Sequence, residues 1–276
     1  FMSRILLFLF ISLIFISLHA EKPKKKGNKK NPKELEEVVI KPDNLITTFK
    51  PSYQKYFDLL STQLHVKPVF AEKKLIGKAT LVIRPHFFSQ NSVTLDAKWM
   101  KINSVELVSA EGNKKLPFTY DTLHLKIDLQ KFYTSSQQVT LVIDYVALPY
   151  TQNAAQIELG RGLYFIDADD KNPYKPTHLW TQGEEESASC WFPTMDATNQ
   201  KSSEEVFVTI DKNLTSLSNG LLLDSKDNND GTKTDHWKQD KPHSSYLFFL
   251  CVGDFYKWKT NWRDKEVSAY TFPEYQ

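Results

Sequence analysis

The sequence lacks the clustered residues that most catalytic and metal sites need. It has only two cysteines among 276 residues, so no C-x-x-C metal or redox pair exists. Its seven histidines never lie four residues apart, and the motifs H-E-x-x-H, G-x-S-x-G and G-x-x-x-x-G-K are absent. The chain by itself therefore carries no complete active site for hydrolysis or nucleotide binding.

Two pairs of potential ligands remain, and each has a plainer interpretation. Cys190 and Cys251 could form one disulfide in an oxidising compartment or remain two buried thiols, and we favour the two thiols. His236 and His243 could bind a metal only together with a third ligand. Because no third ligand stands near them in the sequence, histidines at the surface or the core edge are the simpler interpretation.

Helical periodicity is also scarce after the first 20 residues, and residues 53–60 are the best helical candidate. Apolar and polar residues instead alternate in several segments, which is the pattern of half-buried strands. The nearly continuous apolar run 244–255 predicts a central strand buried on both faces. The sequence therefore predicts an all-β fold of two or more antiparallel or mixed sheets. The alternating segments are 78–84, 121–129, 139–145 and 206–210, and residues 266–272 are expected to start another strand.

The first 45 residues differ in composition from the rest. Residues 1–20 combine Arg4, an apolar run and the small residue Ala20, which is the pattern of a secretory signal peptide; an uncleaved membrane anchor is the alternative. Residues 21–45 are rich in lysine and predict a disordered linker. We therefore expect an exported protein, periplasmic or extracellular, with membrane contact only if the leader is kept. The folded domain is expected over residues 46–276.

An excess of positive over negative charge is confined to this N-terminal region. Residues 1–33 carry Arg4 and seven lysines against Glu21, whereas the net charge of the whole chain is only +2. The remaining residues are therefore mildly acidic. This balance argues against a nucleic-acid partner, because nucleic-acid surfaces are usually strongly basic.

One stretch, residues 180–201 (WTQGEEESASCWFPTMDATNQK), interrupts the strand pattern. It begins with Gln182, Glu184, Glu185 and Glu186 and then turns apolar. Carboxylates beside an amide could hold a cation such as an ammonium group through charge-assisted hydrogen bonds. A solvated acidic loop is the alternative, but carboxylates next to a buried aromatic segment are costly features without a use.

The same stretch matches a known family pattern, T-Q-x-E/Q followed by Ala-Arg and F-P-C-x-D-E-P-x-x-K, without a gap. With these residues the chain resembles the N-terminal domain of the aminopeptidase N family of zinc peptidases. Departures at Ser189, Thr194, Ala197 and Thr198 leave the acid position intact and weaken mainly the expected pairing of the loop. Further anchors extend the resemblance over residues 64–276. The matching residues are Thr181, Gln182, Glu184, Ala188, Phe192, Pro193, Asp196 and Lys201.

The resemblance implies a saddle-like all-β domain that leans on a catalytic domain. In this family the zinc ligands belong to that catalytic domain, which would follow Gln276, so we expect the zinc of the whole enzyme to be bound outside this chain. The N-terminal domain lends a carboxylate to the free α-amine of the peptide substrate. By position this residue is Glu184, with Gln182 as a neighbouring wall. The chain alone is expected to be an inactive fragment of a zinc aminopeptidase.

Two other function classes remain open from the sequence. A non-catalytic β-sandwich could serve as a binding or scaffold module, since the catalytic motifs are missing from this chain. A carbohydrate-binding sandwich is the weaker alternative, and only the six tryptophans and other aromatic residues favour it.

Overall fold

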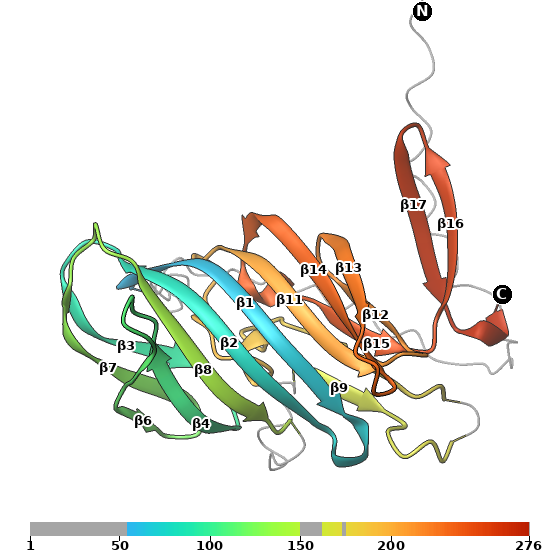
Figure 1. Ribbon diagram of the computed structural model, residues 1–276, viewed down its shortest axis with the longest axis horizontal. Helices are drawn as coiled ribbons and strands as arrows, with labels where there is room; N and C mark the ends of the chain where they lie inside the picture. The colour runs from blue at the N-terminus through green and yellow to red at the C-terminus, as the bar shows by residue number, and fades with distance from the viewer. Residues whose placement is uncertain (1–53, 150–161, 173–174, 276) are drawn as a thin grey trace, which may run out of the picture. The chain divides into compact units, whose positions relative to one another are not determined.

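The computed structural model describes residues 54–149, 162–172 and 175–275, which all belong to the unit Pro51–Gln276 (Figure 1). Strands dominate these residues and form four sheets. The largest sheet has the order β13-β14-β11-β1-β2-β8-β4-β5. Its strands are β1 (Phe57–Val69), β2 (Lys74–Pro85), β4 (Met100–Leu107), β5 (Lys114–Lys115), β8 (Val139–Ala147), β11 (Ser202–Asp211), β13 (Leu221–Asp227) and β14 (Thr232–His243). The predicted all-β fold is confirmed.

Three smaller sheets complete the described residues. One has the order β3 (Gln90–Asp96), β7 (His124–Tyr133), β6 (Phe118–Tyr120), and another has β12 (Thr215–Ser218), β15 (Leu250–Gly253), β10 (His178–Thr181), β9 (Leu163–Ile166). The last is a hairpin of β16 (Tyr256–Trp262) and β17 (Lys265–Thr271). Short 3-10 turns are η1 (Phe70–Glu72), η2 (Ala188–Cys190), η3 (Ser245–Leu247) and η4 (Pro273–Tyr275).

The alternating sequence pattern explains how the layers pack. Every second residue of β8 is buried, from Val139 through Ala147, and β7 buries Leu125, Ile127 and Leu129 in the same core cluster. Each fully buried side chain of this kind stabilises the fold by roughly 1.5–3 kcal/mol. Period-two burial therefore holds the three-stranded sheet against the large one, and the predicted strands at 78–84, 139–145 and 206–210 are confirmed.

A parallel pair positions the acidic stretch. β1 and β11 run parallel, with Leu64 opposite Val206, and a parallel pair needs a long crossover connection. The chain between them holds the whole three-stranded sheet and strands β9 and β10 of the four-stranded one, and it ends with the acidic stretch, which leads directly into β11. Buried Gln200 ties this entry to β1, because its Nε2 donates to the Phe57 carbonyl at 2.7 Å and its Oε1 accepts from the Leu59 N–H at 3.1 Å.

One expectation about local structure is wrong and another is correct only in part. Residues 57–60 of the helical candidate begin strand β1, where Phe57 and Leu59 are buried in alternation, and Tyr53 lies outside the described residues. The apolar run 244–255 is a strand only at residues 250–253, where β15 is buried on both faces and lies between β12 and β10. Before it the chain forms the turn η3, in which the Leu247 and Phe248 N–H groups donate to the Ser244 and Ser245 carbonyls and are therefore not used in a strand ladder.

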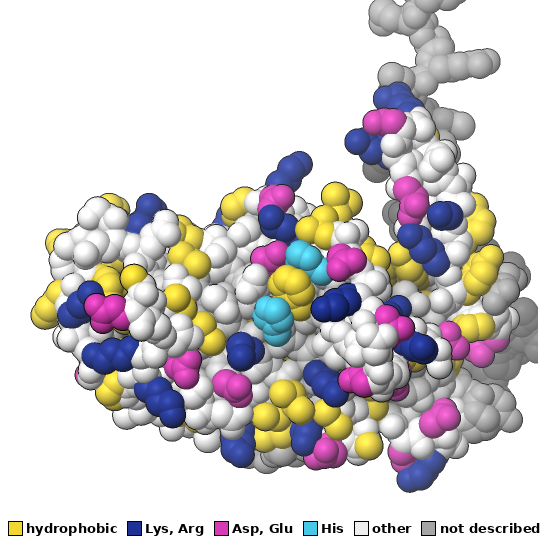
Figure 2. Space-filling model, viewed as in Figure 1, with side chains coloured by type: hydrophobic (Ala, Val, Ile, Leu, Met, Phe, Trp, Pro, Cys, Tyr) yellow, Lys and Arg dark blue, Asp and Glu magenta, His cyan; other side chains and the backbone are white. Residues whose placement is uncertain are grey.

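Other sequence expectations concern residues or properties beyond the described structure. The leader 1–20 and the linker 21–45 lie outside the described residues, and the saddle-like shape stays a prediction. Among the described residues no helix is long and apolar enough to span a bilayer. On the face shown in Figure 2, basic and acidic side chains are interspersed, so this face presents no large surface of one sign.

Candidate functional site

The acidic stretch begins where strand β10 leaves the four-stranded sheet. Trp180 stacks on Tyr164 of β9, with ring centroids 4.7 Å apart. The Thr181 hydroxyl accepts a hydrogen bond from the Leu250 N–H at 2.9 Å, and the Gln182 N–H donates to the Gly162 carbonyl at 2.9 Å. The chain is therefore held on both sides up to the first residue of the acid loop, which we define as residues 182–186.

Two glycines let the acid loop and the residue that follows it pack closely on their neighbours. A Cβ atom at Gly183 would lie 2.2 Å from the Tyr246 carbonyl oxygen in η3. Gly162 has a φ of +65°, and a Cβ there would lie 2.1 Å from the Ser187 carbonyl oxygen. Both distances are far below van der Waals contact, and the positive φ also favours glycine. The loop backbone is therefore confined between η3 and the chain before β9.

The side chains of the acid loop, by contrast, face solvent. Gln182, Glu184, Glu185 and Glu186 are all exposed. The Glu184 N–H donates to Gln182 Oε1 at 3.4 Å, a weak bond, and Lys98 Nζ donates to the Glu186 carbonyl. No described basic side chain forms an ion pair with any of the three carboxylates. These carboxylates are thus available to a cation from outside the chain.

The next eleven residues are buried without interruption, and we call residues 187–197 the anchor. Trp191 and Phe192 have no exposed surface, and Phe192 stacks on Phe248 at 5.3 Å with an interplanar angle of 16°. Buried aromatic pairs of this kind add roughly 0.5–1.5 kcal/mol beyond the burial of their area. The exposed acid loop is therefore joined directly to one of the most rigidly packed parts of the fold.

Asp196 organises the polar groups of the anchor. Its carboxylate accepts from the Ser189 N–H at 2.9 Å and from the Ser245 hydroxyl at 2.9 Å. Its own N–H donates to the Asp96 carboxylate at 2.8 Å. Burial and the nearby Asp196 charge raise the pKa of Asp96, while that hydrogen bond opposes the shift. Asp196 thus links the anchor to η3 and to β3 through hydrogen bonds.

The family departures at Ser189 and Thr194 do not open the anchor. The Ser189 carbonyl accepts from the Lys98 N–H at 2.8 Å, and Thr194 forms an antiparallel bridge with Asp96. Backbone groups make these contacts, so they tolerate a change of side chain. The backbone of residues 189 and 194 is therefore paired with that of residues 98 and 96 in the structure.

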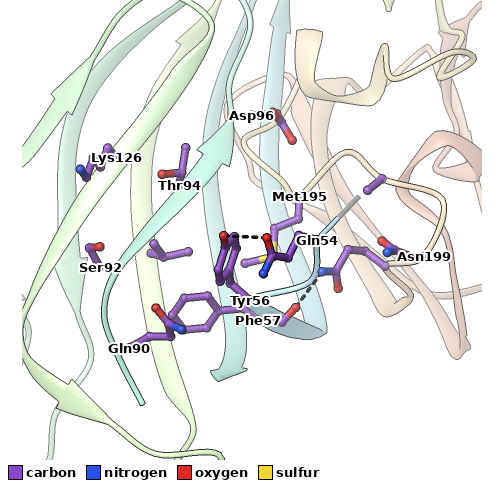
Figure 3. Close-up of a pocket in the computed structure, with 13 residues that line it drawn as sticks. Gln54, Tyr56, Phe57, Gln90, Ser92, Thr94, Asp96, Lys126, Met195 and Asn199 are labelled. Carbon is purple, nitrogen blue, oxygen red and sulfur yellow. Dashed lines mark hydrogen bonds between the residues drawn. The ribbon is translucent and has the colours of Figure 1, made fainter. Parts of the chain in front are cut away.

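A pocket of about 380 Å³ lies beside the anchor, between the start of β1 and the edge of β3 (Figure 3). Met195 and Asn199 line one side of it, and Ser92 and Thr94 line another. None of the acid-loop residues contributes to it. Sequence reasoning missed this pocket, because its walls come from segments far apart in the chain and none of them carries a motif.

The described residues do not fit a zinc site, since no three His, Cys, Asp or Glu side chains among them are grouped to hold a metal. His236 Nε2 lies 2.7 Å from Glu205 Oε1, and His243 Nε2 lies 3.0 Å from Glu204 Oε2. Each histidine is thus engaged with its own carboxylate, and the alternative of a shared metal between them is wrong.

Both cysteines are free thiols in the structure. Cys190 and Cys251 are buried, and burial raises the pKa of the Cys190 thiol to about 12 and that of Cys251 to about 11. Thiols with such pKa values are protonated at neutral pH and are poor nucleophiles or ligands. The disulfide alternative is not realised here.

Comparison with known proteins identifies relatives of the chain. The chain is 25% identical over 251 residues to leucine aminopeptidase 2 of the yeast Vanderwaltozyma polyspora, which covers 88% of this chain and 35% of the relative. It is 24% identical over 221 residues to transcription initiation factor TFIID subunit 2 of Drosophila melanogaster, covering 67% of this chain and 18% of that protein. The chain thus spans about a third or less of the length of these relatives.

Solved structures share the fold. The M1 zinc metallopeptidase of Deinococcus radiodurans superposes with a TM-score of 0.62 at 18% identity, over 75% of this chain and 44% of that one. A mutant of the same enzyme bound to a Tyr-Ser-Ala substrate superposes with a TM-score of 0.63 at 16% identity, over 80% and 48%. A sequence model of the Peptidase M1 N-terminal domain matches residues 50–247, more than half of this chain. The chain therefore belongs to the Peptidase M1 N-terminal domain family.

Proposed function

We propose that this chain is the substrate-anchoring N-terminal domain of a zinc aminopeptidase, in which Glu184 binds the free α-ammonium group of a peptide. The observation that carries the proposal is the contrast between the exposed Glu184 side chain and the buried anchor that follows it. A carboxylate on a fixed backbone can make short, charge-assisted hydrogen bonds to an ammonium group. Gln182 places an amide group beside this carboxylate, as a wall of the proposed binding site.

The proposed role explains how such an enzyme would act only at a peptide's N-terminus. A fixed anion sets the distance from the free amine to the reacting bond, so only the first peptide bond is in reach. This chain would bind and orient the substrate, and it would supply no metal ligand. In the whole protein we expect the zinc ligands in a catalytic domain after Gln276.

Exposed apolar side chains support a catalytic-domain partner for this chain. Leu221, Leu222 and Leu223 of β13 are 70%, 48% and 53% exposed, and Trp258 and Trp262 of the β16–β17 hairpin are 51% and 60% exposed. An isolated two-stranded hairpin is marginally stable in water. We therefore propose that these apolar side chains pack against the catalytic domain of the same protein.

Export is a further part of the proposal and rests on the leader sequence. The pattern of residues 1–20 supports a secretory signal. Secretion of the full-length protein, with an N-terminus near residue 21, is the expected result. Retention of the intact leader on a membrane fraction would instead favour the anchor alternative.

The function is tested on the full-length protein with two substrates that differ only at the amine. An aminoacyl anilide should be hydrolysed and its N-acetylated form should not, because acetylation removes the charge that Glu184 would bind. Activity should disappear when a chelator removes the metal. Equal hydrolysis of both substrates, or none of either, contradicts the proposal.

A scaffold module is the second candidate function. Its support is the similarity to a TFIID subunit, which is named as a transcription factor component and not as a peptidase. The discriminating observation is the coding sequence beyond Gln276. An H-E-x-x-H motif within about 100 residues supports the enzyme, and its absence together with undetectable peptidase activity supports the scaffold.

A further inference from the structure

Strand β3 has an open edge beside the pocket of Figure 3. Among the described residues it lies at the edge of its sheet and pairs only with β7, apart from the bridge between Asp96 and Thr194. Asp96 directs both its N–H and its C=O to Thr194, at 2.7 and 3.0 Å. Backbone groups of an antiparallel strand alternate in direction, so those of Thr94 and Ser92 point to the same open side. Neither residue's backbone has a hydrogen-bond partner on that side among the described residues.

The chain itself pairs with only the end of this edge. Thr194 pairs with Asp96 as an antiparallel strand would, and continuing that strand would place Asp196 opposite Thr94. The Asp196 N–H instead donates to the side chain of Asp96 at 2.8 Å. The carbonyl of Thr94 is therefore left without the partner that a longer strand would have supplied.

A groove follows the open part of the edge. The pocket of about 380 Å³ has an apolar floor that includes Phe57, Val93 and Met195. A second pocket of about 310 Å³ adjoins it and shares Gln54, Tyr56 and Gln90. Its wall carries the largely exposed side chains of Phe87 and Phe88, which are 74% and 81% exposed.

We propose that the open edge of β3 and its adjoining groove bind an extended peptide segment of a partner protein as an added strand. Unpaired N–H and C=O groups along a strand edge are satisfied in register only by another extended backbone. Thr194 already pairs with this edge at Asp96 in the antiparallel manner of a strand, and the bound segment continues that pairing along Thr94 and Ser92.

The lining of the groove also indicates which side chains the partner segment should carry. Alternate residues of a strand point to opposite faces, so one set faces the apolar floor and the other faces the rim. Lys126 lies on the rim opposite Thr94 and forms no ion pair with a described residue. The segment therefore has apolar residues at every second position and an acidic residue near Lys126, and the aromatic pair takes an apolar residue at its end.

The first test needs no ligand and measures amide hydrogen exchange of the chain. The outward amides of Ser92 and Thr94 should exchange much faster than the amides of Val93 and Leu95, which face β7. Slow exchange at Ser92 and Thr94 would show that the edge is already occupied and would overturn the proposal.

The second test uses a displayed library of random twelve-residue peptides, from which binders are selected and titrated by fluorescence anisotropy. Thr94→Pro removes the outward N–H without breaking the ladder to β7, and it should weaken binding about tenfold or more. Thr94→Val keeps the N–H and the shape, so it should bind like the wild type. Phe88→Ala, at a largely exposed position, should weaken binding about threefold or more without affecting folding.

Three outcomes overturn the proposal. The selection yields no binding peptide, or Thr94→Pro binds selected peptides as well as Thr94→Val does. A soluble glycan that binds at Phe87 and Phe88 and is insensitive to Thr94→Pro would assign the groove to a carbohydrate instead. Protection of the Ser92 and Thr94 amides by a bound peptide is the supporting result.

Discussion

The acid loop and the anchor are neighbours in the sequence and opposites in their surroundings. All four polar side chains of the loop face solvent and form no ion pairs with described residues, whereas every residue of the anchor is buried. Substitutions in a buried segment usually lower the stability of the fold, whereas substitutions in an exposed segment usually do not. The contrast indicates that the packing of the anchor fixes the position of the loop backbone. The loop carboxylates remain available to bind a group from outside the chain.

The largest effect should come from removing the centre of the anchor. Trp191→Ala should lower the free energy of unfolding by about 3–5 kcal/mol, because a fully buried aromatic side chain is lost and a cavity remains. Urea denaturation measures this. The matched control is Trp191→Phe, which should cost much less, because the indole N–H has no hydrogen-bond partner among the described residues to lose.

Removing the polar centre of the anchor should have the next largest effect. Asp196→Ala leaves the Ser189 N–H and the Ser245 hydroxyl without an acceptor, and should cost about 2–4 kcal/mol. Asp196→Asn retains an acceptor and should cost less. Equal stability of Asp196→Ala and the wild type in urea would show that the anchor is not held through this carboxylate.

The stability of the fold should depend on pH through a buried ion pair that lies next to η3. Burial lowers the pKa of His243, but the hydrogen bonds to Glu204 and the Lys241 carbonyl and the Glu204 charge outweigh it, so the pKa is raised above 6.5. Burial likewise raises the pKa of Glu204, against the effect of His243. For both groups the folded state binds protons more tightly than the unfolded state, so stability falls as pH rises through the folded pKa values.

The test compares the wild type with His243→Gln across this range. At pH 6 the variant should be less stable by about 1–2 kcal/mol, because glutamine can donate to Glu204 but carries no charge. The difference should shrink as the pH rises through the raised pKa of His243. A difference that stays constant from pH 6 to pH 9 would contradict the assignment.

The smallest effect on stability should come from the acid loop itself. Glu184→Ala and Glu185→Ala should each change the free energy of unfolding by no more than about 0.5 kcal/mol, as exposed substitutions usually do. Thermal unfolding measures this. A large loss for Glu184→Ala alone would mean that its carboxylate has a structural role.

The sequence predicts the strands well because alternation reports directly on burial, as in β8 and β11. The prediction fails at residues 53–60, because a segment this short fits the periodicity of a helix as well as that of a strand. Only the pairing of Phe57 with β2 makes it a strand. The position of Glu184 came from the family pattern, since charge alone does not separate it from Glu185. The groove beside β3 was invisible because Thr94 and Met195 meet only through tertiary pairing.

The most direct test of the central claim is a kinetic comparison of Glu184→Ala with Glu185→Ala in the full-length protein, using aminoacyl anilides. Loss of a charge-assisted hydrogen bond to the substrate amine should lower kcat/KM for Glu184→Ala by roughly 10- to 100-fold. Glu185→Ala should stay within about twofold of the wild type, and both variants should unfold at the wild-type temperature. Unchanged kcat/KM in Glu184→Ala would contradict the proposed role of the acid loop.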